Sequence, residues 1–204
     1  MKDSYKTIDI PSTESMYKEK GSKFYGLAFP VTTETDINEV LEKVKKEHYK
    51  ARHWCYAWQI GKEKEKFRYN DDGEPSNSAG APIYGQIESF DLTNILIIVV
   101  RYFGGVKLGV GGLVRAYKTA AKLALESSKI QTKTINDEFI LTFEYKDMNR
   151  IQRVIKKHNI PIIDQKLELN CQYTISMRKS RTKTIIEAFE ELRCVRIINS
   201  ENIK

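Results

Sequence analysis

Residues 95–118 read ILIIVVRYFGGVKLGVGGLVRAYK, and this stretch decides the fold of the first half of the chain. It begins with a continuous apolar, largely β-branched run, which is typical of a strand buried on both faces. Five of the 11 glycines then fall within residues 104–112. From Leu113 onward, apolar and small residues recur at helical spacing. The stretch therefore predicts a central strand, a glycine-rich turn and a helix packed closely on the sheet.

The pattern on either side of this stretch predicts the rest of one domain. Asp36, with Glu39 three residues later, predicts the N-cap of a helix that runs to about residue 48. A second helix is expected over residues 78–89, with Ser78 as its cap. The other predicted strands cover residues 21–31, 52–60 and 67–69.

The second half of the chain has a regular order of elements. Residues 131–134 read as a connector, so we predict two domains, residues 1–130 and residues 135–204. The order strand–helix–strand–strand–helix–strand in the second domain is that of a ferredoxin-like sandwich. The fold class is therefore α+β. The predicted strands cover residues 139–145, 161–169, 171–177 and 195–198, and the predicted helices cover residues 148–155 and 185–192.

The composition restricts the class of protein. The 204 residues are 41% hydrophobic and 30% charged, which fits a globular chain, and 34 Lys and Arg against 27 Asp and Glu give a net charge of +7. This excess suits an anionic partner such as RNA without identifying one. No stretch approaches the roughly 18 apolar residues of a membrane span, and the N-terminus lacks the apolar core of a signal peptide. Three cysteines without paired spacing argue against a disulfide framework or a zinc site. We expect a cytoplasmic protein with no membrane partner.

The glycine-rich turn is a candidate anion site. Backbone amides near Gly111 and Gly112 have no partner at the start of the following helix, so they favour a phosphate. The turn lacks the Gly-Lys-Ser/Thr ending of a P-loop and the third glycine of the dinucleotide fingerprint. Alternatively these glycines, with Gly104 and Gly105, only turn the chain and allow close packing. The cations of the candidate site are Arg101, Lys107, Arg115 and Lys118.

An acidic turn is a second candidate site. Asp71, Asp72 and Glu74 place three carboxylates within four residues, and Ser78 follows as a further polar group. Such carboxylates suit a hard metal ion or acid–base chemistry. The spacing does not match a calcium loop, and Asp-Gly before Glu-Pro is a good turn sequence in its own right. We expect no metal, no cofactor and no catalytic residue, and a polar loop site at these four residues remains an alternative.

The strand at residues 52–60 carries the remaining candidates. Arg52 shares one face with three aromatic residues, which form a base-stacking platform if exposed and a core if buried. His53 shares the other face with Cys55, which raises the idea of a Cys/His nucleophile. Nothing in the sequence orients the imidazole.

Four motifs in order carry a resemblance to a known family. They resemble the IMPACT/YigZ family over most of residues 17–125, and residues 139–199 look like the C-terminal domain of its bacterial members. The resemblance implies an N-terminal α/β domain similar to a ribosomal protein's second domain and to the fourth domain of elongation factor G, followed by a ferredoxin-like domain similar to those of elongation factor G. The motifs are GSKF at residues 21–24, ARHWCYA at 51–57, DDGEP with AGAP at 71–82, and VRYFGG through GGLVRAY at 100–117.

The resemblance also implies a role in translation. Eukaryotic members regulate translation through translation-control proteins, and bacterial members are proposed to bind nucleic acid or the ribosome. Our leading hypothesis is a non-enzymatic regulator that binds RNA or the ribosome at the glycine-rich turn, with Arg52 and His53 adding contacts. The alternatives are an enzyme acting on a phosphorylated small molecule or nucleotide, and a regulatory adaptor that binds another protein.

Overall fold

The computed structural model describes residues 3–200, and the chain divides into two compact units. Residues 5–133 form the N-terminal unit, and residues 134–200 form the C-terminal unit together with residues 3–4. Within the C-terminal unit, Ile135 N–H donates to the Asp3 carbonyl at 2.7 Å, and the Ser180 hydroxyl donates to the Asp3 carboxylate at 2.5 Å. Residues 131–134, expected to be a connector, lie in strand β7 (Ile130–Thr134), which pairs with β1 (Ser4–Ile8).

The N-terminal unit contains a five-stranded sheet in the order β2-β3-β6-β4-β5. Every neighbouring pair in this sheet is antiparallel. The central strand is β6, as predicted, and its side chains alternate between two cores. Ile95, Ile97 and Val99 lie in one core, while Leu96 and Ile98 lie in the other. The strands are β2 (Ser15–Glu19), β3 (Ser22–Pro30), β4 (His53–Ile60), β5 (Lys66–Asn70) and β6 (Ile95–Tyr102).

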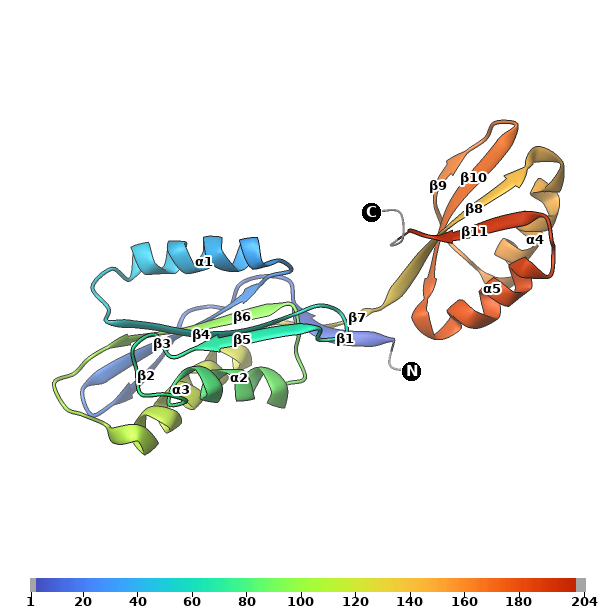
Figure 1. The fold of residues 1–204 in the computed structure, drawn as a ribbon. Coiled ribbons are helices and arrows are strands. Elements are labelled where there is room, and N and C mark those ends of the chain that lie inside the picture. Colours follow the sequence, from blue (N-terminus) through green and yellow to red (C-terminus); the bar gives the residue numbers. More distant parts are fainter. Residues whose placement is uncertain (1–2, 201–204) are drawn as a thin grey trace. The chain divides into compact units, whose positions relative to one another are not determined.

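Helices cover both faces of this sheet (Figure 1). Helix α1 (Glu34–Glu47) packs on one face, while α2 (Gly80–Ser89) and α3 (Gly109–Glu126) pack on the other. The approach of α3 is close, because a Cβ atom added at Gly26 of β3 would lie 2.3 Å from the Ala120 carbonyl oxygen. The absence of a side chain at Gly26 therefore permits this close contact.

The start of α1 differs from the prediction. Thr33 is the N-cap, and its hydroxyl accepts from Asp36 N–H at 3.1 Å. The Asp36 carboxylate accepts in return from Thr33 N–H at 3.0 Å, which makes Asp36 the third helical residue of a capping box. The N-cap lies three residues before the predicted one, at Thr33, because Thr33 already has the extended backbone that an N-cap requires.

This capping box gives one testable acid dependence. Hydrogen bonds from Thr32 N–H and from Thr33 lower the pKa of Asp36 from 3.8 to about 2. A lowered carboxyl pKa contributes stability above the unfolded value, and that contribution is lost as the pH falls through the folded value. We expect the difference in unfolding free energy between the native protein and Asp36→Asn to shrink as the pH falls from 3.8 toward about 2, measured by urea titration. A difference that stays constant over this range would contradict the assignment.

The C-terminal unit is a four-stranded antiparallel sheet in the order β11-β8-β10-β9, and its elements follow the predicted strand–helix sequence. Helices α4 and α5 contribute Ile151, Ile155, Ile185 and Phe189 to a core that includes residues of β8 and β10. Among residues 3–200, no helix combines the length and apolar character needed to cross a membrane. The elements are β8 (Asn136–Glu144), η1 (Tyr145–Asp147), α4 (Met148–His158), β9 (Ile162–Lys166), β10 (Asn170–Arg178), η2 (Lys179–Arg181), α5 (Thr182–Glu190) and β11 (Val195–Asn199).

Candidate functional site

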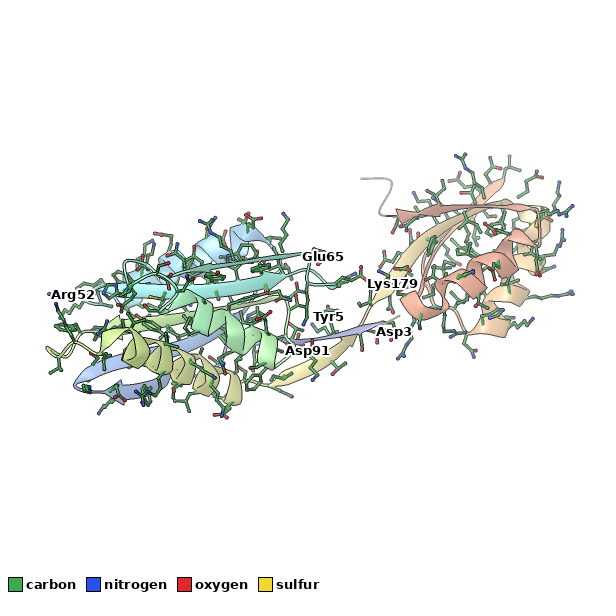
Figure 2. All side chains as sticks on the ribbon, turned by 60° about the horizontal axis from the view of Figure 1, so that its bottom comes forward. Asp3, Tyr5, Arg52, Glu65, Asp91 and Lys179 are labelled. Atoms are coloured by element: carbon green, nitrogen blue, oxygen red, sulfur yellow. The ribbon has the colours of Figure 1, made fainter. Side chains whose placement is uncertain are left out.

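A cavity of about 520 Å³ opens where the start of β4, the loop after β5 and the loop after β6 meet. The antiparallel register brings these segments together, since His53 pairs with Arg101 and Tyr56 pairs with Asn70. Arg52, which lines the cavity, lies at the left-hand edge of the N-terminal unit in the view of Figure 2. The polar or aromatic lining residues are Arg52, His53, Glu74, Arg101, Phe103 and Lys107.

The acidic turn is held in shape by its own side chains. The Asp71 carboxylate accepts from Ala79 N–H at 2.9 Å and from Gly80 N–H at 2.8 Å, so it satisfies the first amides of α2. The Asp72 carboxylate accepts from Trp54 N–H at 2.7 Å. Ser78 does not cap α2 as predicted, because its hydroxyl donates to the Pro75 carbonyl at 2.6 Å. Within the described part of the chain, no group of three His, Cys, Asp or Glu residues suits a metal ion.

Glu74 is the acidic residue of this turn that lines the cavity, and it is nearly buried. Its Oε1 atom accepts from Arg101 Nη1 at 2.5 Å and from the Tyr117 hydroxyl at 2.8 Å. The guanidinium of Arg101 also lies 5.5 Å from the ring centroids of Phe24 and Phe103. Arg101 is 5% exposed, so its positive charge interacts mainly with Glu74 and with two aromatic rings.

His53 is oriented by the backbone of the acidic turn. Its Nδ1 atom lies 2.8 Å from the Asp72 carbonyl oxygen, and a carbonyl only accepts, so Nδ1 carries the proton in this hydrogen bond. The Nε2 atom then lies 3.9 Å from Glu74 Oε1. The fold therefore fixes the imidazole at the cavity wall, which the sequence alone did not indicate.

Cys55 has no part in the cavity. Its side chain is fully buried, and its Sγ donates to the Asp71 carbonyl at 3.0 Å. Burial raises the pKa of the Cys55 thiol far above its ordinary value, and burial likewise raises the pKa of the Tyr117 hydroxyl. A protonated, buried thiol is a poor nucleophile, so the geometry does not support a Cys/His pair.

The aromatic face of β4 is core. Trp58 is 6% exposed, while Trp54 and Tyr56 pack against the cluster under α1. The base-stacking alternative therefore does not apply to these residues.

Backbone geometry explains most of the glycines after β6. A Cβ atom at Gly104 would lie 1.9 Å from the Gly21 carbonyl carbon, so the two backbones touch. Gly105 and Gly109 have φ values of +87° and +72°, which L side chains rarely adopt. At Gly111 an added Cβ atom would meet no other atom within 4 Å among the described residues. Close packing and turning thus account for three of these glycines.

The predicted cations separate into two groups. Arg52, Arg101 and Lys107 line the cavity, whereas Arg115 and Lys118 lie on the exposed side of α3 and do not line it. Gly104, Gly105, Gly111 and Gly112 are also outside the lining, and Gly109 at the start of α3 is inside it.

Several residues that line the cavity were not predicted from the sequence. Phe103 and Val110 lie in the glycine-rich turn and are 43% and 57% exposed. An aromatic residue directly before two glycines was an available signal for Phe103. The bond from Tyr117 to Glu74 had no such signal, because Tyr117 sits in an apolar helical pattern.

Comparison with known proteins shows which family this chain belongs to. The Impact N-terminal domain model matches residues 20–125, which defines the chain as a protein built on that domain. An IMPACT family member of Haemophilus influenzae is 31% identical over 184 residues, covering 88% of this chain and 87% of that protein. The Escherichia coli IMPACT family member YigZ is 37% identical over 126 residues, covering 61% of this chain and 62% of that protein. The chain belongs to the IMPACT family, as its motifs predicted.

A solved structure matches this chain along most of its length. The crystal structure of a hypothetical protein has a TM-score of 0.71 and 26% sequence identity to this chain, and the match covers 98% of both chains. The mixed α/β fold with antiparallel sheets is therefore shared along the chain.

Proposed function

We propose that this chain is a cytoplasmic, translation-associated regulator that binds RNA, free or within the ribosome, at the cavity of the N-terminal unit. The observation that carries the proposal is that the unpaired charged side chains lining the cavity are positive. Arg52 and Lys107 are exposed, and neither has an ion-pair partner among residues 3–200. Glu74 supplies the carboxylate of the cavity lining, and the positive charge of Arg101 already neutralises it. The free charge that meets a ligand is positive, which suits phosphate.

The backbone at the cavity supports the same ligand. Gly109, which lines the cavity, is the first residue of the 18-residue helix α3. The N-cap residue of α3 is Leu108, whose apolar side chain cannot accept a hydrogen bond. First-turn amides of α3 therefore remain available at the cavity and favour an anion.

Exposed apolar groups beside these cations fit the bases of a single strand. Phe103, Val106 and Val110 are 43%, 52% and 57% exposed on the glycine-rich turn. Unpaired RNA bases stack on aromatic rings without a strict sequence preference. Arg115 and Lys118 would extend the phosphate contacts along α3.

The proposal predicts a defined salt dependence. We expect Arg52→Ala and Lys107→Ala each to lower the slope of log affinity against log salt concentration by about one unit for single-stranded RNA. Lys46→Ala is the matched control, because Lys46 is exposed on α1, which covers the opposite face of the sheet. Fluorescence anisotropy with labelled RNA at several salt concentrations measures the slopes. Equal slopes for all three variants, or no binding by the native chain, would overturn the proposal.

A second candidate function is an enzyme acting on a phosphorylated small molecule or nucleotide. His53 favours it, since its Nε2 is directed toward a buried carboxylate in a cavity of the size that small ligands occupy. Saturable binding of nucleotides by the native chain, with substrate turnover that His53→Gln abolishes, would support the enzyme. Binding of RNA without turnover would support the regulator.

For the C-terminal unit we infer a ferredoxin-like sandwich. Its element order and its sheet order β11-β8-β10-β9 support this assignment. This fold serves many functions, so it adds binding surface to the proposal without naming a ligand.

A further inference from the structure

The edge strand β9 of the C-terminal unit is the most exposed strand of its sheet. It pairs with β10 on one side, and its other side lies at the edge of the sheet beyond β10 (Figure 1). All residues from Ile162 to Lys166 are exposed. Ile163, Leu167 and Leu169 are 54%, 52% and 91% exposed. An edge with accessible apolar side chains and backbone N–H and C=O groups is a template for pairing with another strand.

The opposite edge of the same sheet is different. In β11, Val195 and Ile197 pack against the core of the unit, and both are half-buried. The apolar side chains of β11 are thus already used by the fold. This contrast singles out β9 as the edge with unused apolar surface.

The sequence of β9 is complementary to itself when reversed. In an antiparallel pairing of two copies centred on Gln165, Asp164 lies opposite Lys166 of the second copy. The twofold axis repeats this pair, so two opposite-charge pairs form. The same register places Ile163 opposite Leu167 of the second copy.

The two charged side chains are available for such a contact. Among residues 3–200, neither Asp164 nor Lys166 has an ion-pair partner. Asp164 and Lys166 pair with Thr174 and Gln172 of β10, so both charges lie on one face of the sheet. Ile163 falls at the register shift between β9 and β10, which leaves its side chain without a directly opposed residue.

We propose that two copies of this chain associate through antiparallel pairing of their β9 strands, centred on Gln165. The two C-terminal sheets then form one continuous sheet. The contact involves one short strand from each copy, so it is small and the dimer is weak and dependent on concentration. The proposal does not depend on the RNA-binding function.

Charge reversal tests both the association and its register. We expect the full-length chain to show a concentration-dependent dimer in sedimentation velocity. Asp164→Lys alone, or Lys166→Asp alone, makes both symmetric pairs repulsive and is expected to weaken the dimer by at least about tenfold. The double variant Asp164→Lys with Lys166→Asp restores opposite charges and is expected to recover the native dimer.

The matched control is Arg196→Asp, a charge reversal at an exposed position of β11, which is expected to leave the dimer unchanged. Circular dichroism checks that each variant is folded. A native chain that stays monomeric up to the highest soluble concentration would overturn the proposal. Single reversals that dimerise like the native chain, or a double variant that fails to recover, would overturn the register and with it the proposal.

Discussion

Replacing Glu74 with alanine is expected to destabilise the N-terminal unit by about 3–5 kcal/mol, the usual cost of removing one partner from a buried ion pair. The side chains of Glu74 and Arg101 are 5% and 6% exposed, so the guanidinium left behind has little access to water. The Tyr117 hydroxyl would also lose its acceptor. Urea unfolding followed by tryptophan fluorescence measures the change.

Two further variants separate the loss of charge from the loss of packing. Glu74→Gln keeps an acceptor for the Tyr117 hydroxyl but removes the negative charge, so an intermediate loss is expected. Replacing both Glu74 and Arg101 with methionine removes the charges together, and this variant should be more stable than Glu74→Ala. A loss below about 1 kcal/mol for Glu74→Ala would show that the pair behaves as a surface ion pair.

Gly104→Ala is expected to destabilise the N-terminal unit by about 3 kcal/mol or more, at the upper end of the usual cost of overpacking. The added methyl group would lie 1.9 Å from the Gly21 carbonyl carbon and 2.2 Å from Ser22 N. Both atoms belong to the backbone of the chain around the start of β3, so no side-chain rotation can relieve the overlap. Thermal and urea unfolding both report this loss.

Gly111→Ala is the matched control for this change. It lies in the same turn-and-helix segment, but the structure leaves open space within 4 Å of its Cβ position among the described residues. Because alanine favours a helix more than glycine does, Gly111→Ala is expected to be neutral or to stabilise by up to about 1 kcal/mol. Equal losses for the two variants would contradict the account of Gly104.

The parts of the fold that the sequence predicted are those with a strong local pattern. The apolar run of β6 predicted a strand buried on both faces, and both cores contain its side chains. Strands β1 and β2 were missed because each has five residues of mixed polar and apolar type, so no alternation of residue types marks them in the sequence. The position of the cap of α1 was wrong by three residues because Asp36 and Thr33 are both good cap residues.

The sequence predicted the two loops that form the candidate site. It did not predict the contacts that Glu74 makes within the site. Asp71 and Asp72 were placed in a turn, which the structure bears out with backbone hydrogen bonds to both carboxylates. The role of Glu74 depends on Arg101 and Tyr117, which are 27 and 43 residues away along the chain. No local pattern contains such a contact, so the sequence assigned Arg101 to phosphate and gave no sign of its bond to the Glu74 carboxylate.

The division of the chain also bears on its order of synthesis. Residues 5–133 are made before any of residues 134–200, so the N-terminal unit can fold while the remainder is still being translated. The C-terminal sheet must wait for β11, which pairs with β8 and is made last among its strands. Asp3 leaves the ribosome before the N-terminal unit, yet Ile135 and Ser180, which bond to it, emerge only after the whole of that unit. The earliest described residue of the chain is therefore among the last to reach its native contacts.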